Sequence, residues 1–176
     1  MRCIMQFYIE PNGETTDHDL SRKEFRAAAQ EAARHVAQVV GGKLIRVTTG
    51  EFIVNAEIEM PLARLFRVFR EHVDLEPPVF DKSQNRWLVG MISPGWMLEW
   101  KRGQKYYRHE EIPDGVWLEI LPYVPFDNPW DAQAFYRLVC ALGKLTSALA
   151  SRSKKEAKPN GNSSDVSAGL GFGPAH

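Results

Sequence analysis

Near Ser21 the spacing of apolar residues changes from every second residue, as in a strand, to about every 3.6 residues, as in a helix. This change constrains which elements the first 40 residues can form. Residues 3–9 alternate apolar and polar side chains, with one apolar face made by Cys3, Met5, Phe7 and Ile9. Ser21 and Glu24 then have the spacing of a capping box, which starts a helix. Apolar residues continue at helical spacing as far as Gly41-Gly42, where a glycine can adopt the left-handed conformation that ends a helix. The sequence therefore predicts a strand followed by a helix that begins at Ser21.

The next segment predicts a hairpin, a second helix and a further strand. Residues 44–49 and 52–58 are rich in β-branched and aromatic residues and are separated by a short turn around Gly50. Pro61 suits the first turn of a helix. The apolar stripe of that helix consists of Leu62, Leu65, Phe66, Phe69 and Val73. Pro77-Pro78 closes this region, and residues 86–92 have the composition of a strand.

This order of elements is that of a ferredoxin-like βαββαβ sandwich, so we expect an α+β fold with a mostly antiparallel sheet. An added C-terminal region of β-hairpin or strand character follows, with two short strands around residues 101–104 and a last strand at 116–121. Asn128-Pro129 starts a third helix, which we expect to dock on the core. Residues 1–150 are thus predicted to form a single α+β domain. Residues 151–176 are rich in Ser, Gly and Lys, and we expect a flexible tail.

Charge and composition narrow the classes of function. Lys and Arg number 22, as do Asp and Glu, so no global basic excess favours nucleic acid or an anionic membrane. The sequence contains no motif of a nucleotide-binding loop, a zinc protease or a nucleophile elbow. We therefore expect no cofactor and no metal. A motif-poor sequence lowers the odds of an enzyme without excluding one.

Compartment is inferred from the cysteines and from the N-terminus. Cys3 and Cys140 fall within apolar patterns and are expected to be reduced core thiols. The first residues lack the apolar core of a signal peptide, and no run has the length of a membrane helix. We therefore expect a soluble, cytoplasmic protein that does not bind membranes.

The strongest candidate for function is a segment in which aromatic rings alternate with cations. All five tryptophans lie between Trp87 and Trp130, and the densest stretch spans residues 96–109. The residues that we predict to contact a partner are Trp96, Trp100, Lys101, Arg102, Lys105, Tyr106, Tyr107, Arg108 and His109. Large rings beside guanidinium and ammonium groups are typical of recognition surfaces. The alternative is that the rings fill the core of a hairpin while the cations stay in water.

Three functions fit this segment. The first is a non-catalytic interaction protein that binds another protein, by analogy with small inhibitors, immunity factors and adaptors of bacteria and phages. The second is single-stranded nucleic-acid binding by ring stacking, which the neutral net charge disfavours. The third is an enzyme without short motifs, in which His109 and a neighbouring glutamate act as acid and base. The interaction protein is the function that the sequence favours.

Overall fold

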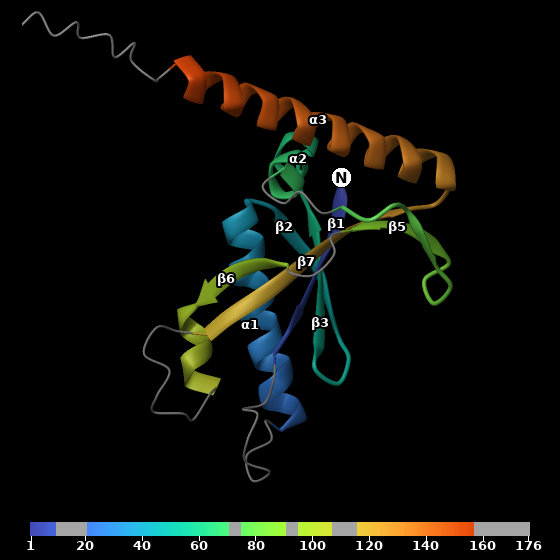
Figure 1. The fold of residues 1–176 in the computed structure, drawn as a ribbon. Coiled ribbons are helices and arrows are strands. Elements are labelled where there is room, and N and C mark those ends of the chain that lie inside the picture. The colour runs from blue at the N-terminus through green and yellow to red at the C-terminus, as the bar shows by residue number, and fades with distance from the viewer. Residues whose placement is uncertain (10–20, 71–74, 91–94, 107–115, 157–176) are drawn as a thin grey trace, which may run out of the picture.

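The computed structural model describes residues 1–9, 21–70, 75–90, 95–106 and 116–156, which form an α+β fold around one antiparallel sheet (Figure 1). The strands are β1 (Arg2–Tyr8), β2 (Lys43–Thr49), β3 (Ile53–Glu59), β4 (Val79–Asp81), β5 (Arg86–Gly90), β6 (Trp96–Trp100) and β7 (Val116–Phe126). The helices are α1 (Arg22–Val40), α2 (Leu62–Arg70), the 3-10 helix η1 (Lys101–Tyr106) and α3 (Pro129–Glu156).

Both predicted ends of α1 are confirmed. The Ser21 hydroxyl accepts from the Glu24 amide, and the Glu24 carboxylate accepts from the Ser21 amide, which completes the capping box. At the other end, Gly41 has φ 65° and its amide bonds to the last carbonyls of the helix. The predicted hairpin of β2 and β3 is confirmed as well, because the two strands pair antiparallel. Local rules were sufficient here because caps and tight turns depend on neighbouring residues only.

One face of the sheet forms the core. The inward residues of β1 and β3 are fully buried, namely Cys3, Met5, Phe7, Val54, Ala56 and Ile58. α1 packs on this face through an alanine-rich side of Ala28, Ala29, Ala32, Ala33 and Ala37 with Val36 and Val40. Both cysteines are free thiols, and burial raises the pKa of Cys3 to about 12. Cys3 is therefore an unreactive core residue, as expected.

The predicted ferredoxin-like order is wrong, although the coarser α+β class is confirmed. The main sheet runs β2-β3-β1-β7-β5-β4, and β6 pairs with β7 outside this path. A ferredoxin-like sheet needs the strand after the second helix beside β1, but β5 lies beyond β7 and pairs with it. β7 takes the place next to β1, with Ile4 opposite Tyr123. The last strand of the described chain is therefore a central strand and not an added layer.

The predicted hairpin around residues 101–104 is also corrected. β6 forms as expected, but it pairs with Val116–Ile120 of β7. Lys101–Tyr106, where the second strand was expected to start, forms the 3-10 helix η1. Gly103 explains this turn, because its α-carbon lies directly against the Trp100 indole and a Cβ there would be 2.5 Å from a ring carbon. The chain therefore folds back over Trp100 instead of continuing as a strand.

α3 begins as predicted and is anchored by its first turns. The Asn128 side chain accepts from the Asp131 amide at 2.9 Å, which caps the helix next to Pro129. Phe135 packs among Phe66, Phe69 and Phe126, with ring centroids 5.9, 5.7 and 5.3 Å away. Beyond Val139 the helix runs on past α2 (Figure 1), to Glu156 and through the predicted domain boundary at residue 150. Only the first half of α3 thus docks on the core, and the predicted tail from residue 157 onward lies outside the described residues.

Trp100 provides a test of the fold. Its ring is fully buried and stacks on Tyr106 with centroids 5.8 Å apart. Trp100→Ala should lower the free energy of unfolding by about 3–5 kcal/mol, because it leaves a large cavity in the core. Trp130, 81% exposed, is the matched control, and Trp130→Ala should change it by less than about 0.5 kcal/mol. Urea denaturation measures both values, and equal small effects would show that the Trp100 ring is not packed as described.

Candidate functional site on the open face of the sheet

The aromatic and basic segment predicted to bind a partner is in large part packed against α1. Lys105 and the Tyr106 hydroxyl both bond to the Glu31 carboxylate, the hydroxyl at 3.0 Å. His35 Nε2 donates to the Glu99 carbonyl at 3.0 Å and ties β6 to the same helix. These contacts span about 70 residues of sequence and fix η1 on the domain. The described part of the segment therefore has a structural role, which agrees in part with the alternative that its rings pack in the core.

The predicted contact residues separate into three groups. Trp100 is buried in the core, which corrects the expectation that its ring stands in water, and Trp96 and Tyr106 are half-buried. Lys101, Arg102 and Lys105 are exposed, although Lys105 is bonded to Glu31 and Lys101 lies 3.8 Å from the Glu99 carboxylate. Tyr107, Arg108 and His109 lie outside the described residues, so the prediction for them stays open. Among residues 96–106, the cations are exposed, whereas the aromatic rings are buried or half-buried.

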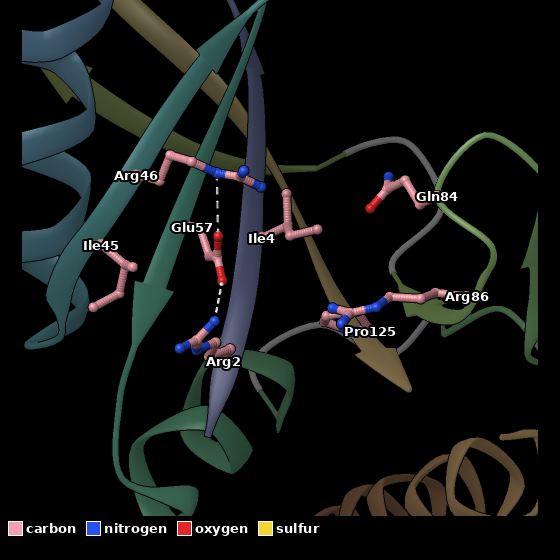
Figure 2. Close-up of a pocket in the computed structure, with 8 residues that line it drawn as sticks. All are labelled: Arg2, Ile4, Ile45, Arg46, Glu57, Gln84, Arg86 and Pro125. Carbon is pink, nitrogen blue, oxygen red and sulfur yellow. Dashed lines mark hydrogen bonds and ion pairs between the residues drawn. The ribbon is translucent and has the colours of Figure 1, made fainter. Parts of the chain in front are cut away.

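The opposite face of the sheet carries the groove that we take as the candidate site (Figure 2). Its volume is about 650 Å³. We call it the arginine groove, and it is lined by Arg2, Ile4, Ile45, Arg46, Glu57, Gln84, Arg86 and Pro125. All these residues belong to β1, β2, β3, β5, β7 or the β4–β5 turn, so no helix contributes to its lining. A smaller hollow continues it along Thr48 and Asn55.

Three guanidinium groups surround the groove. In Figure 2, Arg46, Glu57 and Arg2 follow one another across β2, β3 and β1, while Gln84 and Arg86 lie on the other side. Glu57 accepts from Arg2 at 3.1 Å through one carboxylate oxygen and lies 3.5 Å from Arg46 through the other. Arg86 lies 3.3 Å from Asp127 at the rim. The arginine side chains remain 61, 70 and 48% exposed, so they keep N–H donors available for a ligand.

The β4–β5 turn holds the far wall of the groove. Asp81 accepts from the Ser83 amide at 2.8 Å and from the Gln84 side chain at 2.9 Å. Asp81 also accepts from the Ser83 hydroxyl at 2.6 Å. These hydrogen bonds lower the pKa of Asp81, and the bond from the Ser83 hydroxyl has the largest effect. Asn85 adopts the left-handed conformation with φ 52°, which asparagine tolerates in turns. Gln84 and Arg86 are thus placed by a turn of defined geometry.

Exposed apolar side chains lie at the other end of the same face, beside Glu99 and Glu119. The outward residues of β7 run from Trp117 to Pro125, alternating with the buried Leu118, Ile120, Pro122 and Val124. Trp117 of β7 is 54% exposed, and Met97 of β6 is 51% exposed. The Tyr123 ring lies against Gly90, where a Cβ would be 2.0 Å from a ring carbon. The open face therefore combines a cationic groove with exposed apolar side chains.

Sequence reasoning missed this site. Arg2, Arg46 and Arg86 are isolated cations in the sequence, and none belongs to a motif that indicates a binding site. The one signal in the sequence was the alternation of side chains along each strand. Arg2 and Ile4 lie on the outward face of their strand, and Glu57 lies on the outward face of another strand. Only the pairing of β1 with β3 and β7, of β2 with β3 and of β5 with β7 brings these positions together.

Comparisons with protein-family models, curated proteins and solved structures find no match for this chain. Within the described ranges, no three His, Cys, Asp or Glu side chains are grouped so that they could hold a metal ion. None of the helices in these ranges has both the length and the apolar content needed to cross a bilayer. Any functional conclusion must therefore come from the geometry of the surface.

The Glu31 carboxylate provides a pH test of the role assigned to η1. Hydrogen bonds from Lys105 and Tyr106 lower the pKa of Glu31 below its ordinary value of 4.5. Because the pKa of Glu31 is lower in the folded state than in the unfolded state, its ionised carboxylate stabilises the fold above pH 4.5. This stabilisation is lost as the pH falls through the folded-state pKa. Lys105→Met should therefore be destabilising near neutral pH, and its difference from the wild type should shrink in acid. Denaturation midpoints across the pH range measure this.

The control for this test is Lys101→Met on the same 3-10 helix. Lys101 lies 3.8 Å from the Glu99 carboxylate, and its side chain is 79% exposed. Solvent screens such a pair, so its removal should have a smaller effect at every pH. A Lys105→Met effect that is independent of pH would contradict the contribution of Glu31.

Proposed function

We propose that the protein is a non-catalytic interaction protein that binds another protein through the arginine groove. The ligand that fits best is an extended segment with acidic and aliphatic side chains. The observation that carries this proposal is the Glu57 carboxylate held between Arg2 and Arg46. The groove already binds one carboxylate of its own chain, and guanidinium groups pair with carboxylates through directional, charge-assisted hydrogen bonds.

The shape of the groove supports an extended ligand. Its lining combines the aliphatic side chains of Ile4, Ile45 and Pro125 with the three arginines. A strand-like segment presents alternate side chains in opposite directions, so a segment lying along the groove can turn its aliphatic side chains toward one wall and its carboxylates toward the arginines of the other. Exposed Trp117 and Met97 extend the contact area along the same face. Tryptophan and arginine are the residues that most often dominate protein interfaces.

Charge favours a protein ligand over nucleic acid. A phosphate backbone needs a continuous series of cations, whereas here Glu57 lies in the middle of the groove and Asp127 at its rim. Three arginines against two carboxylates leave a small local excess of positive charge. Such an excess suits a few ligand carboxylates, and the neutral charge of the whole chain agrees with this choice.

A short peptide tests the proposal directly. The probe is a capped hexapeptide in which glutamate alternates with leucine, and its binding to the full chain is followed by amide chemical shifts. We expect the shifted signals to cluster at the groove residues of β1, β2 and β5. Arg46→Ala combined with Arg86→Ala should weaken binding by about tenfold or more, because each charge-assisted hydrogen bond contributes roughly 1.5–3 kcal/mol.

Matched controls separate specific binding from general attraction. Arg22 and Arg26 are exposed on α1, so Arg22→Ala combined with Arg26→Ala removes the same charge outside the groove and should leave the affinity unchanged. The peptide with glutamine in place of glutamate should bind more weakly than the acidic one. Equal binding of the two peptides, or tighter binding of a single-stranded oligonucleotide, would refute the proposed ligand.

A further inference from the structure

The second half of α3 is a helix with an exposed apolar stripe. Phe135 and Val139 are buried in the first half, whereas no residue from Ala141 to Arg152 is buried. The stripe consists of Leu138, Leu142, Leu145 and Leu149, at spacings of four, three and four residues. Leu138, Leu145 and Leu149 are 47, 57 and 56% exposed. These spacings place all four leucines on one side of the helix.

This half of the helix also has poor intrinsic stability. Gly143 lies in its middle, and a Cβ at that position would touch nothing within 4 Å, so packing does not require the glycine. The Thr146, Ser147 and Ser151 hydroxyls each bond to the carbonyl four residues earlier. Glycine, serine and threonine are weak helix formers, and a short helix without tertiary packing is marginal in water. Contact along the leucine stripe would therefore stabilise this half.

The charge of α3 indicates what kind of surface can provide that contact. Residues 132–152 contain Arg137, Lys144 and Arg152 and no carboxylate. Lys154, Lys155 and Glu156 follow in the sequence. Two copies of residues 132–152 side by side would bring cations together without carboxylates in that range to compensate them, which disfavours self-association through the leucine stripe. An apolar groove with an acidic rim would satisfy both the leucines and the cations.

We propose that the second half of α3 is a docking helix for an acidic-rimmed apolar groove on a partner protein. Leu138, Leu142, Leu145 and Leu149 insert into the groove, and Lys144 and Arg152 pair with carboxylates at its rim. One leucine per helical turn matches the spacing of anchors in helix-in-groove recognition. This surface is separate from the arginine groove, so the protein has two contact surfaces and can join two partners.

The test uses the full chain with calcium-loaded calmodulin as a probe, because that protein offers a methionine-rich apolar groove suited to amphipathic helices. We expect binding that protects the amides of residues 138–152 from hydrogen exchange. Leu145→Ala combined with Leu149→Ala should weaken binding by about tenfold or more without lowering the melting temperature. Lys144→Glu combined with Arg152→Glu should weaken it as well.

Two controls complete the test. Leu62→Ala removes a similarly exposed leucine, 47% exposed on α2, and should leave binding to the probe unchanged. Arg46→Ala with Arg86→Ala should also leave it unchanged, which keeps this result distinct from the outcome for the arginine groove. Absence of binding to the probe, or equal binding by the Leu145 and Leu149 variant, would overturn the proposal. So would a dimer held by the leucine stripe, or preferential binding to phosphatidylserine vesicles.

Discussion

The pairing of β7 with three other strands is the constraint on which the rest of the structure depends. Its residues Leu121–Tyr123 pair with β1, Tyr123–Phe126 with β5 and Val116–Ile120 with β6. The inward side chains from Leu118 to Val124 are buried on the same strand. A strand that is hydrogen-bonded to neighbours from both halves of the chain joins the early hairpin to the late strands in one sheet.

This central strand also determines which face of the sheet is open. The alanine-rich side of α1 packs on the face that contains Cys3, Met5 and Phe7, and α3 meets β7 through Phe126. The outward side chains of the same strands are half-buried or exposed. The cations on that face, Arg2, Arg46 and Arg86, therefore gather around a single groove although 84 residues of sequence separate the first from the last. The open face and the apolar covered face follow from the same alternation along each strand.

The aromatic segment shows how tertiary packing can change the meaning of a sequence pattern. Trp100 and Tyr106 stack on each other, and Gly103 lies against the indole, so the rings are used within the fold. The Glu31 carboxylate then holds Lys105 and Tyr106 against α1. A run of rings and cations in a sequence is compatible with either a surface or a core. Which of its side chains are buried is determined only when another element of the fold covers one side of the run. In this chain that partner is α1.

The sequence by itself determined the local elements: the capped helix from Ser21, the hairpin of β2 and β3, the start of α3 at Asn128-Pro129, and the α+β class. Each depends on residues within a few positions of one another. Tertiary structure alone decided the position of β7 in the sheet and the burial of Trp100. It alone also decided the formation of the arginine groove and the absence of packing along the described second half of α3. Strand order depends on contacts between distant segments, and the apolar pattern of α3 continues past the residues that meet the core. Periodicity specifies which side of an element is apolar, but only the assembled fold specifies what covers that side.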